Sequence, residues 1–350
     1  MNQEQLYSSV LVKIGVERSN LLNKQKLERL TDCKSLKEFA VELEQTIYGK
    51  NITHLVQPYT ANVFEKAFRE NFIEVCIKIV RSSPDVASEF LKNYLLKFEH
   101  ENIKTILRAI SIGLPYDELK SKIYLPVETF LKRQKLILKA AMAIQVKLVV
   151  DALQNTVYGP SLITGLKKYE ETGSTKYFDI LLDRMFYEYL GKSMKDLPKS
   201  DRKLAFFYVS RQTDCFNIVT ILRAKLLGYE PNWIRMTVSR NFYNVPKQTI
   251  EAMLTAKNFE AAFNIVKQSY YKKFFVKSDI PQETISIAEK NFRRNIFEHI
   301  KKTEIGDPFN VESPIAFIVK KEIEIYNLTA INLGIEYNWK KNDILRLLLF

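Results

Sequence analysis

The sequence predicts an all-α protein, and three observations support that prediction. Only 10 glycines and 11 prolines occur among 350 residues, so few positions interrupt a helix. Apolar residues recur mainly at spacings of three and four, as on one face of a helix, with little of the alternation typical of strands. Several phrases also occur three times in one order, which predicts three similar helical bundles.

Two long helices are expected from two segments of almost identical sequence. The first reads ENIKTILRAISIG over residues 101–113, and the second reads FNIVTILRAKLLG over residues 216–228. In each, isoleucines and leucines spaced by three and four form one apolar stripe. Gly113 and Gly228 are expected to end these helices, because each follows the last apolar turn and a proline comes soon after it.

The two helices share a pattern that occurs once more near the C-terminus. An acid is followed after two residues by asparagine and then by isoleucine or leucine, and the asparagines stand 115 and 110 residues apart. Residues three apart lie on the same helix face, so each acid and asparagine can act as a pair. The pairs are Glu99 with Asn102, Asp214 with Asn217, and Glu324 with Asn327.

Two further markers precede each pair in the same order. The phrases EQTIYG, QNTVYG and KQSYYK contain Tyr48, Tyr158 and Tyr271, and FEKAF, LDRMF and AEKNF contain Glu65, Asp183 and Glu289. This order predicts internal triplication with units of about 110 residues. The predicted repeats are residues 1–125, 126–238 and 239–350, arranged about a pseudo-threefold axis.

Asparagine is a poor helix former, so its recurrence within helices needs an interpretation. The residues could form a ligand or partner site repeated three times, or buried polar bonds that hold neighbouring helices together. The second interpretation is favoured, because buried polar groups usually satisfy one another. Arg108 and Arg223 occupy equivalent positions and are expected to pair with Glu65 and Asp183 of their own copies, whereas the third copy has Leu333 there.

No catalytic, cofactor-binding or metal-binding residues are predicted. The segment GPSLITGLK, residues 159–167, has one residue too many between its glycines for a phosphate-binding loop and leucine where lysine should follow. Neither the histidines nor the cysteines show the spacing of a metal site, a catalytic triad or a disulfide framework. These residues are His54, His100, His299, Cys33, Cys76 and Cys215.

The chain is basic, with 53 Lys and Arg against 40 Asp and Glu, a net charge of +13. Acidic proteins, nucleic acids and anionic membranes are therefore all admissible partners. SYYKKFFVK, residues 269–277, interleaves bases with aromatics as nucleic-acid or membrane-surface segments do, but packing is favoured because Tyr271 belongs to a repeated phrase. No uncharged run approaches the roughly 20 residues of a membrane span, and the N-terminus lacks secretory features, so a cytoplasmic protein is expected.

Three stretches carry a resemblance to a known family. They are residues 16–49, which begin VERSNLLNK, the two helices that contain NI and LRA, and residues 312–334, which begin ESPIAFIVK. With them the chain resembles the C subunit of archaeal and bacterial A/V-type rotary ATPases, which is related to the d subunit of the eukaryotic vacuolar enzyme. The resemblance spans nearly the whole chain and implies three homologous helical bundles in a funnel.

The resemblance implies a non-catalytic rotor subunit without a cofactor, which couples ATP turnover to ion transport. Such a subunit lies peripherally on the cytoplasmic side of the membrane and contacts the proteolipid ring and the foot of the central shaft, with no nucleic acid involved. Two alternatives stay open. A basic helical scaffold would bind acidic proteins or RNA, with binding that weakens steeply with salt. An all-α enzyme with an unrecognised site would respond to a substrate screen or a metal analysis.

Overall fold

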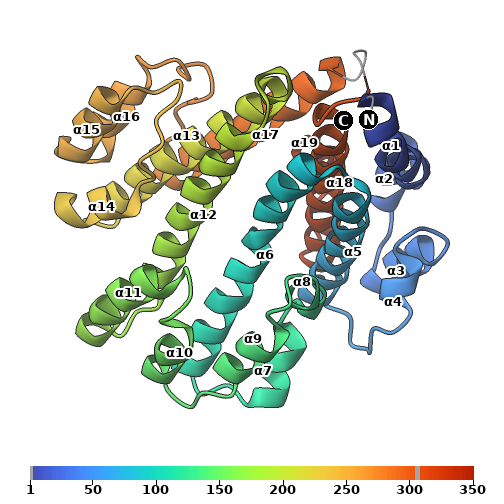
Figure 1. Ribbon diagram of the computed structural model, residues 1–350, viewed down its shortest axis with the longest axis horizontal. Helices are drawn as coiled ribbons and strands as arrows, with labels where there is room; N and C mark the ends of the chain where they lie inside the picture. The colour runs from blue at the N-terminus through green and yellow to red at the C-terminus, as the bar shows by residue number, and fades with distance from the viewer. Residues whose placement is uncertain (1–2, 304–307) are drawn as a thin grey trace. The chain divides into compact units, whose positions relative to one another are not determined.

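The computed structural model describes residues 3–303 and 308–350, and helices supply all the regular secondary structure in that part of the chain (Figure 1). The prediction of an all-α fold is confirmed. The chain divides into two compact units, one of Met1–Leu95 with Phe297–Phe350 and one of Leu96–Ile296. The division falls within two continuous helices, α6 (Asp85–Ser111) and α17 (Pro281–Thr303).

The first unit joins the two ends of the sequence around helix α18. Its other complete helices are α1 (Gln3–Ser19), α2 (Lys24–Leu30), α3 (Leu36–Glu44), α4 (Gly49–Ile52), α5 (Ala61–Ser82) and α19 (Lys341–Leu347), with α18 spanning Glu312–Glu336. Helix α18 is buried on most of its surface and packs mainly along α5 (Figure 1). Asn332 Nδ2 donates to the Ala61 carbonyl at 3.0 Å, and the Ala61 N–H donates to Glu336 Oε1 at 2.9 Å. Helix α18 thus holds the start of α5.

The second unit contains two large hydrophobic cores and a small cluster of Tyr177, Leu181 and Trp233. Its complete helices are α7 (Tyr116–Lys122), α8 (Leu125–Phe130), α9 (Gln134–Ala141), α10 (Val146–Leu153), α11 (Gly159–Thr172), α12 (Lys176–Asp196), α13 (Arg202–Leu226), α14 (Pro231–Thr237), α15 (Lys247–Thr255) and α16 (Phe259–Val266), with a short 3₁₀ turn at Lys199–Asp201. One core surrounds Tyr158 and Phe178, and the other surrounds Tyr271 and Phe275. Each core therefore contains one of the repeated tyrosines.

The helix ends expected at Gly113 and Gly228 are confirmed. Both glycines have left-handed backbones, with φ of 70° and 69°, and the N–H of the residue after each donates to a carbonyl within the preceding helix. The end of α18 repeats this geometry at Asn338, with φ of 54°. Glycine adopts this conformation without a steric penalty, and asparagine tolerates it better than most residues. No described helix is long and apolar enough to cross a membrane.

Candidate functional site

The repeated acids and the repeated tyrosines meet in pairs inside the two units. Each tyrosine hydroxyl donates a hydrogen bond to an acid that precedes a repeated asparagine, but the acid comes from a different predicted copy. The pairs are Tyr48 with Glu324, Tyr158 with Glu99, and Tyr271 with Asp214. All six side chains are buried. We call these pairs polar locks and name each one by its acid.

The Glu324 lock lies in the first unit and contains a buried cation. Lys321, one turn earlier on α18, donates to Glu324 Oε1 at 2.7 Å and to the Tyr48 hydroxyl at 2.6 Å. The Lys321 side chain is only 1% exposed, so the ammonium and the carboxylate compensate each other away from water. Burial and the Glu324 charge raise the pKa of Tyr48, which keeps its hydroxyl protonated as a donor.

The Glu99 lock lies in the second unit and contains a second carboxyl group. Arg133 donates to Glu99 Oε2 at 2.7 Å, and Tyr158 donates to the same oxygen. Glu128 is fully buried and accepts a hydrogen bond of 2.6 Å from the side chain of Asn102. Burial, helped by the nearby Glu99 charge, raises the pKa of Glu128 to about 8. Glu128 is therefore mainly protonated at neutral pH, which limits its repulsion with Glu99.

The Asp214 lock, also in the second unit, uses an amide where the other two locks use a bonded cation. The Asn244 backbone N–H donates to Asp214 Oδ2 at 2.9 Å, and its side-chain amide donates to the Tyr271 hydroxyl at 2.8 Å. Burial raises the pKa of the Asp214 carboxyl, although the hydrogen bonds from Asn244 and Tyr271 oppose that rise. Arg211, one turn earlier on α13, bonds the Tyr270 hydroxyl instead of the acid.

The repeated asparagines bind the backbone of the segment that follows the next short helix along the chain. Each side-chain amide bonds both the N–H and the C=O of one residue 22 positions later. The oxygen accepts at 2.7, 2.7 and 2.9 Å, and the nitrogen donates at 3.1, 3.2 and 2.8 Å. The partners are Tyr124 for Asn102, Ser239 for Asn217, and Leu349 for Asn327.

The ion pairs expected for the two repeated arginines are wrong. Arg108 Nε binds Asp179 at 3.2 Å instead of Glu65, and Arg223 binds Glu289 at 2.8 Å instead of Asp183. Asp179 lies on α12 and Glu289 on α17, so each arginine reaches a helix of the following predicted copy. The same-copy expectation failed because spacing along the chain does not reveal which long helices face each other.

Two of the repeated acids have other partners. The Asp183 carboxylate binds Lys104 of α6, whose side chain is 4% exposed. Glu65 forms an ion pair of 2.6 Å with Arg69, one turn later on α5. Together with Glu289, these acids share a position in the sequence pattern but take part in different contacts.

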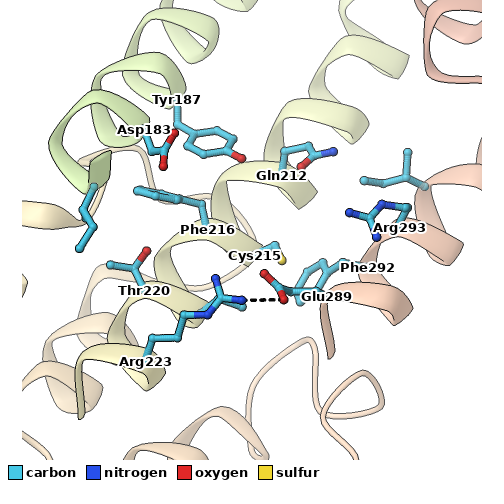
Figure 2. A pocket seen from close by; sticks show the side chains of 13 residues that line it. Asp183, Tyr187, Gln212, Cys215, Phe216, Thr220, Arg223, Glu289, Phe292 and Arg293 are labelled. Carbon is cyan, nitrogen blue, oxygen red and sulfur yellow. Dashed lines mark hydrogen bonds and ion pairs between the residues drawn. The ribbon is translucent and has the colours of Figure 1, made fainter. Parts of the chain in front are cut away.

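A pocket of about 340 Å³ opens between α12, α13 and α17 in the second unit (Figure 2). Its lining carries both signs of charge, and Figure 2 shows Arg223 and Glu289 paired along one wall. Phe216 and Phe292 add aromatic surface, while burial raises the pKa of the Cys215 thiol and keeps it protonated. Aromatic and arginine side chains are enriched in surfaces that contact proteins.

Other candidates from the sequence have packing or backbone roles. Residues 159–167 form the first turns of α11. His100 is buried and packs edge-on against Tyr158 and Phe186, and burial lowers its pKa to about 3, so the imidazole is neutral. Across residues 3–303 and 308–350, no three His, Cys, Asp or Glu side chains are grouped to hold a metal ion.

Sequence reasoning missed several partners within the locks. Lys321 had a readable signal, since it lies three positions before Glu324 and so on the same helix face. Arg133 and Asn244 had none, because they follow their acids by 34 and 30 residues across intervening turns. Only the tertiary fold brings these side chains together.

Comparison with known proteins gives consistent matches along the chain. A family model described as ATP synthase (C/AC39) subunit matches residues 10–347. The chain is 28% identical to the C subunit of the A-type ATP synthase from Methanocaldococcus jannaschii, covering 98% of this chain and 86% of that protein. It is 26% identical to the protein of the same name from Pyrococcus abyssi, covering 97% and 89%, and 24% identical to that of Pyrococcus furiosus, covering 93% and 85%.

Proposed function

Since the chain belongs to the ATP synthase C/AC39 subunit family, we propose that it is a non-catalytic coupling subunit of the rotor. In this role it links the central shaft to the proteolipid ring, so that rotation couples ATP turnover to ion transport. It lies peripherally on the cytoplasmic side of the membrane. The lack of a membrane-spanning helix among the described residues is compatible with attachment through protein surfaces.

The observation that carries this proposal is the recurrence of the buried polar locks. A part that transmits torque must resist sliding of its helices against one another. Each lock ties a long helix to a tyrosine of another segment through at least one buried hydrogen bond. Directional bonds fix the register of packed helices in a way that apolar contact alone does not. The locks therefore support a rigid coupler.

We also propose that the three predicted copies, residues 1–125, 126–238 and 239–350, arose by internal triplication. The asparagine contacts support this proposal, because all three reach a residue 22 positions later with the same pair of hydrogen bonds. The left-handed residue that ends each long helix gives further support. The arrangement of the copies about a pseudo-threefold axis stays a prediction.

The proposed rotor part needs exposed surface through which its partner subunits bind. The pocket on α12, α13 and α17 supplies paired charges and rings, and we propose it as one contact for a protein partner.

Purification of the native complex from membranes tests the proposal. A tagged copy of this chain, expressed at its natural level, should copurify with the ATP-hydrolysing, shaft and proteolipid subunits in fixed proportions. The complex should keep this composition after nuclease treatment. Recovery of RNA or of soluble acidic proteins without any ATPase component would overturn the proposal and favour the scaffold alternative.

A further inference from the structure

The loop between α16 and α17, residues 267–280, has a fixed inner side. Tyr271 is 1% exposed and Phe275 is fully buried, and both belong to the second core of their unit. Lys267 Nζ donates to the Phe275 carbonyl at 3.0 Å, and Asn291 of α17 donates to the Phe274 carbonyl at 2.9 Å. The sequence favours packing for residues 269–277 because Tyr271 belongs to a repeated phrase. That packing is found on the inner side of the loop.

The outer side of the 267–280 loop combines apolar groups with lysines. Tyr270, Val276 and Ile280 are 62%, 52% and 50% exposed. The loop contains four exposed lysines against a single aspartate: Lys267, Lys272, Lys273 and Lys277. All except Lys267, whose ammonium binds the Phe275 carbonyl, are counted with the outer side. Tyr270 packs edge-on against Tyr271 and its hydroxyl accepts from Arg211 at 3.1 Å, yet more than half of its side-chain surface stays exposed. Burial in the hydrophobic core therefore does not explain the exposed apolar side chains of this loop.

The charges of the loop indicate which kind of surface it fits. Ammonium groups beside exposed aliphatic and tyrosine side chains match the headgroup region of a membrane, where phosphates bind lysine and the apolar groups enter the acyl boundary. Lys277 pairs with Glu260 at 2.9 Å, but both side chains are well exposed, so this pair contributes little and leaves the lysine accessible to a phosphate.

A single-stranded nucleic acid is also anionic, but it binds through several exposed rings on which bases stack. The outer side of this loop offers one exposed ring, Tyr270, and two aliphatic side chains that cannot stack. We therefore propose that the 267–280 loop is a contact surface for anionic phospholipid headgroups. This attachment to lipid goes beyond the protein partners of the proposed function and does not depend on them.

Vesicle binding by the purified full chain tests the proposal. The chain should co-sediment with phosphatidylcholine vesicles that contain phosphatidylserine and not with vesicles of phosphatidylcholine alone. The double variant Lys272→Gln/Lys273→Gln should lower the partition coefficient by about 25-fold, since each lysine near an anionic surface contributes about fivefold. The variant Val276→Ser/Ile280→Ser should weaken binding several-fold without changing the net charge.

The matched control is Lys135→Gln/Lys139→Gln, which removes two exposed lysines from α9 of the same unit. It should keep binding within about twofold, because its lysines do not adjoin the loop's apolar groups. Equal losses from control and loop variants would show that only net charge matters and would overturn the proposal. Absence of vesicle binding, or tight binding to single-stranded RNA that the loop variants abolish, would overturn it as well.

Discussion

At the scale of single residues, the three buried tyrosine hydroxyls of the polar locks lie in three different environments. Tyrosine donates to an acid in every polar lock, yet Lys321 neutralises Glu324, Arg133 neutralises Glu99, and Asp214 relies on the amide and backbone of Asn244. A buried carboxylate without a bonded cation depends more on each neutral donor that it has. The Asp214 lock should therefore be the most sensitive to loss of a hydrogen bond.

Asn217, one turn after Asp214, tests the structural interpretation of the repeated asparagines. Replacing Asn217 with leucine removes the bonds to the Ser239 backbone and leaves a buried N–H and C=O unpaired. We expect the free energy of unfolding to fall by roughly 1 to 3 kcal/mol in urea denaturation. Asn264→Leu, at an exposed position on α16, serves as the control and should change it little. A fully stable Asn217→Leu protein that fails only in partner binding would contradict the structural interpretation of the asparagines.

The raised pKa of Glu128 predicts that the stability of the protein depends on pH. Its pKa of about 8 in the folded protein lies above the ordinary value of 4.5. Between these values the folded state keeps a proton that the unfolded chain releases, so the contribution of Glu128 to stability falls as pH rises through this window and levels off above it. Glu128→Gln, which cannot ionise, should therefore lose less stability than the natural protein between pH 5 and about 9.

Chemical denaturation at several pH values measures this difference. Glu118→Gln, on the exposed surface of α7, is the charge-matched control and should follow the natural protein. Parallel curves for the natural protein and Glu128→Gln would show that burial does not hold a proton on Glu128.

At the scale of helices, local features were predictable and tertiary partners were not. The apolar stripes and the ends at Gly113 and Gly228 depend on neighbours within one or two turns, so the sequence pattern contains them. The tyrosine-acid contacts join residues 276, 59 and 57 positions apart, and each crosses between predicted copies. Repetition identified the right residues, but it suggested contacts within a copy because spacing says nothing about which neighbour a helix packs against.

The start of α11 shows why one glycine follows a repeated tyrosine. A Cβ at Gly159 would stand 2.0 Å from the Gln154 carbonyl oxygen, so any side chain forces the backbone to move. Gly159→Ala should lower the free energy of unfolding by roughly 1 to 3 kcal/mol. Gly15→Ala is the matched control, because nothing lies within 4 Å of a Cβ there and α1 is helical. It should raise stability by about 0.4 to 1 kcal/mol. Equal effects of the two changes in thermal unfolding would contradict this account of the turn.

At the scale of the whole molecule, the two ends of the chain share one compact unit. Helix α18 packs along α5, and the Glu324 lock joins residues near opposite ends of the sequence. In the proposed triplication, the last copy therefore contacts the first through the same kind of bond that links the others. Within this unit α1 and α19 both pack on α18, which suits a part that carries torque.

The net charge of +13 predicts how the proposed rotor part is held at the membrane. Contacts between exposed charges are screened over about 8 to 10 Å at physiological ionic strength, whereas apolar contacts are not weakened by salt. Washing native membranes with high salt should therefore release this chain, alone or with the shaft, while low-salt washing leaves it bound. Immunoblots of the washed membranes measure the release. If only detergent frees the chain, apolar contacts dominate and the charge is not what holds it.

Coupling itself is measured most directly in vesicles that contain the reconstituted ATPase complex with and without this chain. ATP hydrolysis and ion uptake are recorded together, and the ratio of ions moved to ATP hydrolysed is compared. With the chain present, the two rates should rise and fall together. Without it, the account predicts that hydrolysis continues while ion uptake is lost, and that adding the purified chain restores the ratio. An unchanged ratio in its absence would contradict the proposed role as the link between shaft and ring.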